Sequence, residues 1–251
     1  MKLFFFIIFS LLFTSSTLGR DIGQTEITTD EGIEVFQKEK YYLLKKNVII
    51  LSDTFELKAD LVKVYFDKDL YDIIKIESTG NVTLKSTRGV IAIGNKINFS
   101  TKKENINVYG DKSSLVYNNI NMFSDKSIQV NNLSGEFNIA GDKSRLKSEK
   151  IEIFGDIIKG FYISLNNINE IKSLYVEDKK LANIINETSN MFALKANYNN
   201  NIIELFEKVK VIRGGEIITG DYAKINTKTD SYKIISNNKE KVKVLISNTN
   251  E

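Results

Sequence analysis

The sequence predicts an all-β protein built from stacked antiparallel hairpins. Apolar and polar residues alternate strictly along short segments, for example in FELKA at residues 55–59 and VKV at 242–244. Such alternation gives each strand one apolar and one solvated face, which is typical of antiparallel sheets. Gly, Asn and Asp separate the segments at short intervals, as hairpin turns require. None of the 251 residues is Pro, so ladder hydrogen bonds can form along every strand.

The first element in the chain is a predicted secretory signal over residues 1–19. Lys2 precedes an apolar run at residues 3–13, and small polar residues follow up to Arg20. A charged start, a short apolar run and small residues before the cleavage point are the features of such a signal. The alternative is an uncleaved anchor, although a membrane-spanning helix needs about 20 apolar residues. We therefore expect cleavage before Arg20 and export from the cytoplasm.

The strands expected after Arg20 follow the alternating segments. They lie at residues 55–59, 62–64, 74–77, 82–85, 151–153 and 242–244. Ile, Val, Tyr, Phe and Thr fill these segments, which suits strand propensity. The best helix candidate, residues 181–191, is short and rich in Asn, so helix has little support.

A two-residue motif recurs among the strands, a small residue followed by Asp, Asn or Glu. It occurs at Ala59-Asp60, Gly94-Asn95, Ser124-Asp125, Ser148-Glu149, Ala196-Asn197 and Gly220-Asp221. Between these sites stand Gly-Asn or Gly-Asp steps, at Gly80-Asn81, Gly110-Asp111 and Gly141-Asp142. The recurrence at equivalent points favours a turn or edge role that satisfies backbone donors over a role in metal binding. One hairpin cannot bury its apolar face alone, so we expect the repeated hairpins to stack around one interior.

No linker rich in Gly, Ser or Pro divides the chain. We expect a single body over residues 20–247, which divides conceptually into halves at 24–140 and 141–247. Residues 248–251 form a predicted frayed tail.

The composition excludes most catalytic chemistry. Without His or Cys the chain cannot build a Ser-His-Asp triad, a thiol nucleophile or an ordinary zinc site. The formal net charge of +3 is too small to indicate nucleic-acid binding. Gly214 and Gly215 lie between two expected strands and predict a hairpin turn, not a phosphate loop. We predict no catalytic residue, no metal and no cofactor, and hence a protein that is not an enzyme.

One set of short segments is informative through its order along the chain. The segments are residues 26–30, 47–50 and 55–64 in the first half, and 196–198, 209–211, 220–225, 235–236 and 242–246 in the second. Taken in this order, they resemble the LptA/OstA family of periplasmic lipopolysaccharide export proteins. Two features depart from the family. Lys46 and Lys208 stand where the family favours Gly and Asn in a turn, and residues 148–190 resemble additional hairpin material.

The resemblance implies an elongated, open antiparallel β-jellyroll, or β-taco. Its apolar groove would shield the acyl chains of lipopolysaccharide (lipid A) during transport from the inner to the outer membrane. The implied partners are an LptC-like inner-membrane protein and an LptD-like outer-membrane protein, with head-to-tail self-association of this chain. A membrane-anchored, LptC-like acceptor is the first alternative. A secreted carbohydrate-binding or adhesin β-sandwich is the second, and residues Tyr41, Tyr42, Tyr65 and Tyr71 come nearest to the aromatic platform that it needs.

Eleven residues are expected to face the groove and bind lipid, according to the alternation in each strand. They are Leu57, Val62, Val64, Ile76, Val82, Leu84, Ile97, Phe99, Val209, Val211 and Ile225. A shift of one residue in register would turn any of these side chains to the other face. The alternative for each of them is an ordinary contact in a filled β-sandwich core.

The first and last strand regions, residues 22–35 and 242–246, are expected to be exposed edges. An unpaired edge is a template for strand addition, and a head-to-tail contact that does not close produces filaments. The alternative is that Lys241 and Lys243 guard the edge against such pairing.

Overall fold

The computed structural model describes residues 21–68, 72–166, 168–237 and 241–246, and all regular structure in these residues is β-strand. The predicted signal at 1–19 and the tail at 248–251 lie outside the described residues. The strands are β1 (Glu26–Thr28), β2 (Ile33–Phe36), β3 (Tyr41–Leu51), β4 (Phe55–Phe66), β5 (Ile73–Ser86), β6 (Val90–Ser100), β7 (Asn105–Tyr109), β8 (Ser113–Tyr117), β9 (Ile120–Ser124), β10 (Ser127–Asn131), β11 (Glu136–Lys147), β12 (Ile151–Leu165), β13 (Ile168–Asn186), β14 (Asn190–Asn199), β15 (Ile202–Arg213), β16 (Glu216–Asn226), β17 (Ser231–Ile235) and β18 (Lys243–Ile246).

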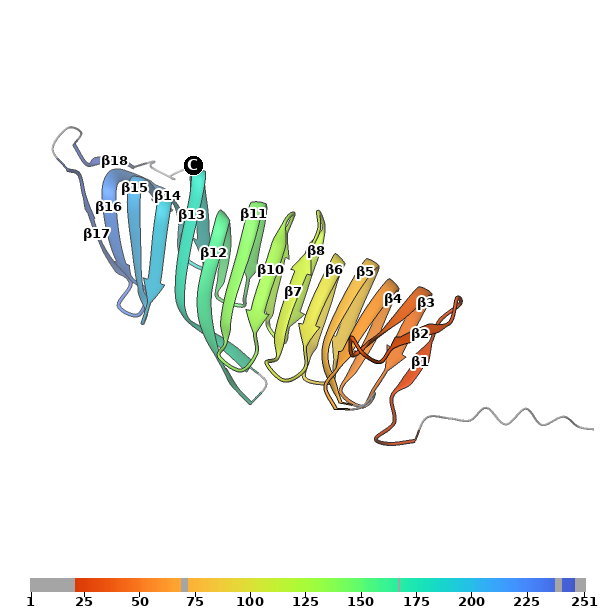
Figure 1. The fold of residues 1–251 in the computed structure, drawn as a ribbon. Coiled ribbons are helices and arrows are strands. Elements are labelled where there is room, and N and C mark those ends of the chain that lie inside the picture. The colour runs from red at the N-terminus through yellow and green to blue at the C-terminus, as the bar shows by residue number, and fades with distance from the viewer. Residues whose placement is uncertain (1–20, 69–71, 167, 238–240, 247–251) are drawn as a thin grey trace, which may run out of the picture.

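The strands lie side by side, largely in chain order, in one elongated stack with β1–β3 at one end and β16–β18 at the other (Figure 1). Pairing is antiparallel throughout, from β3 with β4 to β15 with β16. The all-β jellyroll of stacked hairpins is thus confirmed. Residues 181–191, the best helix candidate, instead end β13 and begin β14. The described residues contain no helix of the length and apolarity that a membrane crossing requires.

Most long strands break register near their middle, and the breaks divide the body into two walls. The shift between β4 and β5 falls between Lys58 and Leu61, and that between β15 and β16 falls between Phe206 and Val209. At β6 the walls separate completely, because its last residues pair with β7 and its first residues pair with β8. We name the walls after these strands. The β7 wall holds β2, β7, β10 and β17, the β8 wall holds β1, β8, β9 and β18, and each long strand contributes one half to each wall.

The line along which the walls meet, here called the fold line, contains the recurrent Asp and Asn residues. At Asp125, Oδ1 accepts a hydrogen bond from the backbone N–H of Lys143 at 3.2 Å. At Asp221, Oδ2 accepts one from the N–H of Asn237 at 2.7 Å. The predicted role in satisfying backbone donors is confirmed at these two positions. Two further occurrences of the motif do not lie on the fold line. Ser148-Glu149 lies in the β11–β12 turn, and Ala196-Asn197 lies after the register break of β14, which falls between Phe192 and Lys195.

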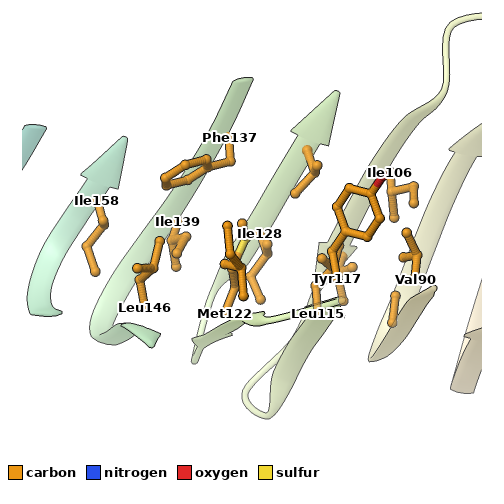
Figure 2. Packing of buried hydrophobic residues seen from close by; sticks show 14 of the residues in the cluster. Val90, Ile106, Leu115, Tyr117, Met122, Ile128, Phe137, Ile139, Leu146 and Ile158 are labelled. Atoms are coloured by element: carbon orange, nitrogen blue, oxygen red, sulfur yellow. The ribbon is translucent and has the colours of Figure 1, made fainter. Parts of the chain in front are cut away.

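Side chains on the inner faces of the two walls form one continuous apolar core. Figure 2 shows its middle part, where Leu115, Met122, Ile128, Ile139 and Leu146 lie between the walls. Among the described residues, the buried polar side chains belong only to Ser and Asn, and none carries a charge. The interior is therefore apolar from β3 to β16.

The segment expected to be additional hairpin material is part of the same meander. Residues 148–190 contain β12 and β13, the two longest strands, which pair with each other and with β11 and β14. Lys46 and Lys208, the two departures from the family pattern, have φ values of 66° and 54° at the fold line. They adopt the left-handed conformation that Gly or Asn would reach at lower cost.

Candidate functional site

The structure places all eleven predicted groove residues on the inner faces of the walls. Phe99 is half-buried against the core and the other ten are buried, which confirms the predicted strand faces. The buried ten are Leu57, Val62, Val64, Ile76, Val82, Leu84, Ile97, Val209, Val211 and Ile225. Binding of lipid by these residues stays a prediction.

In this state the protein's own side chains fill the space between the walls. A cavity of about 10 Å³ lies inside, lined by residues of β12–β15 that include Ile151, Leu174, Ile184, Tyr198 and Ile203. A space of this size is at the lower limit for one water molecule. An acyl chain can therefore lie inside only if the walls move apart and exchange their contacts with each other for contacts with the chain.

Aromatic rings that the sequence analysis missed lie where the edges of the walls face each other. Tyr162 is buried, with its ring 5.6 Å from that of Tyr117 and 6.3 Å from that of Phe137. Its burial raises the pKa of the Tyr162 hydroxyl, and burial raises the pKa of Tyr42 to about 12. The alternation of apolar and polar residues around Tyr117 and Phe137 indicates that these two rings are buried. The local sequence gave no sign that Tyr162 would reach them.

Both ends of the stack expose apolar strands, in the regions predicted as edges. At one end β1 and β2 each pair with β3, and at the other β17 and β18 each pair with β16, so each described end strand is paired along one side. Ile33 and Val35 on β2 and Leu245 on β18 are about half exposed, and Ile246 on β18 is more so. The two ends therefore present backbone edges together with apolar side chains.

The outer surface carries an open hollow of about 430 Å³ over β12–β15. Its lining residues are Lys159, Gly160, Ser173, Leu174, Tyr175, Asn197, Tyr198, Asn199 and Glu204. Glu204 also accepts a hydrogen bond from the Tyr222 hydroxyl at 2.6 Å, which raises the pKa of Tyr222 to about 12.

The tyrosines named as the nearest approach to an aromatic platform do not form a single surface. The rings of Tyr41 and Tyr65 lie 5.9 Å apart, with Lys63 Nζ 3.8 Å from the centre of the Tyr41 ring. Tyr42 is buried in the core, and Tyr71 lies outside the described residues.

Comparison with known proteins gives a structural likeness without support from sequence. No family model and no curated protein matches the chain. A solved structure that it resembles is that of LptH, the LptA homologous periplasmic component of the lipopolysaccharide transport device from Pseudomonas aeruginosa. The identity is 9% and the TM-score is 0.22, and the match covers 89% of this chain and 95% of that chain.

Proposed function

We propose that this protein is a periplasmic carrier that shields the acyl chains of lipopolysaccharide between its two walls. The observation that supports this most is the core, which is apolar from β3 to β16 and has no charged side chain buried among the described residues. Each methylene removed from water contributes about 0.8 kcal/mol, so such an interior can hold an acyl chain once its walls have moved apart, without any chemistry. The choice of lipopolysaccharide among acylated lipids rests on the resemblance of the sequence to the LptA/OstA family.

The ends of the stack suit a carrier that works in a series. The exposed strands β17 and β18 can pair with β2 and β1 of a second copy or of a related partner, which would continue both walls. The apolar interiors of two such molecules would then join end to end. On this proposal the partners at the two membranes are LptC-like and LptD-like proteins, and this chain forms the bridge between them. In the anchored alternative residues 1–19 stay attached, and they lie outside the described residues.

Photo-crosslinking at matched positions tests the location of the lipid. An aliphatic diazirine amino acid close in size to leucine is placed at Leu57 or Val64, which are buried, and at Glu56 or Lys63, which point outward on the same strand. After irradiation in cells, we expect lipid A on the first pair, detected by mass spectrometry of the purified protein. Labelling only at Glu56 and Lys63 would reject the interior as the binding site.

A second candidate function, binding of a carbohydrate, is favoured by the outer hollow of about 430 Å³. That volume lies in the range of ligand sites, and Lys159, Tyr175, Asn197 and Glu204 offer hydrogen-bond donors, acceptors and a ring. Isothermal titration with delipidated polysaccharide tests it, with Tyr175→Ala as the variant expected to lose binding. Absence of binding by the unaltered chain, together with recovery of bound lipid A, would leave the carrier function alone.

A further inference from the structure

The two walls are joined unevenly along the side opposite the fold line, which we call the mouth. Every long strand begins in one wall and ends in the other. The hairpin turns that join successive long strands therefore alternate between the two edges of the mouth. Near β4–β6, the Phe55 ring of the β8 wall meets the Phe99 ring of the β7 wall edge to face at 5.7 Å. Beside them, the Arg88 guanidinium in the β5–β6 turn pairs with the Glu104 carboxylate in the β6–β7 turn across the mouth.

The middle of the mouth is closed by hydrogen bonds between residues 50 apart in sequence. Asn119, in the β8–β9 turn, donates from Nδ2 to the carbonyl of Asn169 at 3.0 Å and accepts at Oδ1 from the N–H of Asn169 at 2.8 Å. The Asn169 side chain is buried and donates from Nδ2 to the carbonyl of Tyr117 at 2.9 Å. The rings of Tyr117 and Tyr162 meet just inside. We call this group the clasp.

The mouth is closed again near the carboxyl-terminal end of the stack. The Arg213 guanidinium, at the end of β15 in the β8 wall, pairs with the carboxylate of Asp230 in the β16–β17 turn of the β7 wall. A second Arg213 nitrogen donates to the Asp230 carbonyl at 3.4 Å.

Between the clasp and Arg213 lies a stretch over β12–β15 that we call the gap. No hydrogen bond, ion pair or ring contact joins its described turns, residues 148–150 and 187–189 on one edge and 200–201 on the other. Ile151 on the β8 wall and Tyr198 on the β7 wall are half-buried at these edges and line the same internal cavity. The gap is therefore a part of the mouth whose two edges both line a space of about 10 Å³ between the walls.

The contacts across the mouth decide where the walls part most easily. At the gap, an entering acyl chain replaces the apolar contacts between the two walls with apolar contacts between each wall and the acyl chain. No polar group in the described turns loses a hydrogen-bond partner there. At the clasp the same movement leaves the buried amide of Asn169 and the carbonyl of Tyr117 without partners, which is costly in an apolar interior. We propose that an acyl chain enters the interior sideways through the gap, between Ile151 and Tyr198, while the clasp stays shut. This inference rests on the proposed carrier function and identifies where the lipid enters the protein.

The absence of Trp from the chain allows a site-specific reporter. Tyr198 and Phe99 are matched positions, because both are half-buried aromatic residues on the inner face of the β7 wall, one residue from the end of their strands. Single variants Tyr198→Trp and Phe99→Trp are titrated with 9,10-dibromostearate, whose bromine atoms quench indole fluorescence on contact. We expect the fluorescence of Tyr198→Trp to fall several-fold at concentrations that leave Phe99→Trp unchanged.

Equal quenching of the two variants, or quenching of Phe99→Trp alone, would overturn the inference and leave the carrier function standing. Quenching of neither would overturn the carrier function itself. Urea unfolding of each variant verifies its fold, and Ile151→Trp with Phe55→Trp repeats the comparison on the β8 wall if one of the first pair fails to fold.

A crosslinking experiment tests the same point by blocking the gap. The chain has no Cys, so a short bismaleimide joins only the two cysteines that are introduced. Crosslinked Ile151→Cys/Tyr198→Cys is expected to take up several-fold less labelled stearate, whereas crosslinked Asn119→Cys/Asn169→Cys, which fixes the clasp, takes up the normal amount. Reduced uptake with the clasp crosslinked, together with normal uptake with the gap crosslinked, would place lipid entry at the clasp and overturn the inference.

Discussion

The carboxylate of Asp60 lies so close to Gly80 that a Cβ at Gly80 would stand 2.3 Å from Asp60 Oδ2. The same oxygen accepts a hydrogen bond from Asn81 Nδ2 at 3.3 Å, so Asp60 on β4 covers the turned backbone of β5 at the fold line. The arrangement repeats along the body. A Cβ at Gly110 would lie 2.8 Å from Asn95 Cγ, and one at Gly141 would lie 2.2 Å from Asp125 Oδ1.

The close approach of Asp60 to Gly80 predicts that Gly80→Ala lowers the free energy of unfolding by more than a positive φ alone would cost an alanine. Gly80 has a φ of 81°, and the new methyl group would also displace Asp60. We expect a loss of about 2–3 kcal/mol in the free energy of unfolding, measured with urea. Gly214→Ala is the control, because its φ is 53° with no atom within 4 Å of an added Cβ, and it should cost only about 1 kcal/mol. Equal losses in the two variants would show that the Asp60 contact contributes nothing.

The sequence was sufficient to predict which strand faces turn inward. Burial alternates with a period of two, so Leu57, Val64 and Val209 could be assigned from their neighbours alone. The small-residue motif predicted that Asp125 and Asp221 satisfy backbone donors, but it gave no sign of the fold line on which they lie. A register break depends on both paired strands, and the sequence shows only one strand at a time.

The contacts across the mouth could not be predicted, because their partners are far apart in sequence and share no local pattern. Arg88 pairs with Glu104 only because the two walls bring their turns together. Asn119 and Asn169 likewise stand out in no way from the many other Asn residues of the chain. These contacts depend on how the walls meet, which follows from the whole fold.

The clasp predicts a large effect for a small change at Asn119. Asn119→Ala removes two part-buried hydrogen bonds, one to the carbonyl and one from the N–H of Asn169, and leaves both backbone groups without these partners. We expect a loss of about 2 kcal/mol in the free energy of unfolding and faster hydrogen exchange at the Asn169 amide. Asn199→Ala, at an exposed position on the outer face, should change stability by less than about 0.5 kcal/mol. Unchanged exchange at Asn169 would show that the clasp does not hold the mouth.

Burial of Tyr42 predicts a loss of stability at high pH. Its pKa rises from the ordinary value of 10.0 to about 12 because burial disfavours the phenolate. The folded state therefore keeps a proton that the unfolded state loses, so stability is complete below pH 10 and falls between about pH 10 and 12. The loss from this group should reach about 1–2 kcal/mol, after allowance for its partial burial. Tyr42→Phe, compared with the unaltered chain in urea at pH 9 and pH 11.5, should remove that part of the decline, and an identical decline in both proteins would contradict it.

The exposed end strands predict self-association that depends on the last strand. Deletion of residues 241–251 removes β18 and with it the edge of the β8 wall at one end, while β17 still covers the adjoining half of β16. We expect the truncated chain to fold and to sediment as a monomer at concentrations where the full chain forms a concentration-dependent series of oligomers. Urea unfolding should verify that the core is retained.

The charges beside that edge provide the control for the deletion. If Lys241 and Lys243 guard the edge, Lys241→Ala/Lys243→Ala should increase association, because the variant removes two hydrated charges that disfavour strand addition while leaving the backbone edge intact. If β18 is the site of contact, the variant keeps its oligomers and the deletion loses them. Oligomers that persist in the deletion would reject β18 as the contact and would leave β17, with Tyr232 and Ile235 exposed, as the remaining described edge at that end.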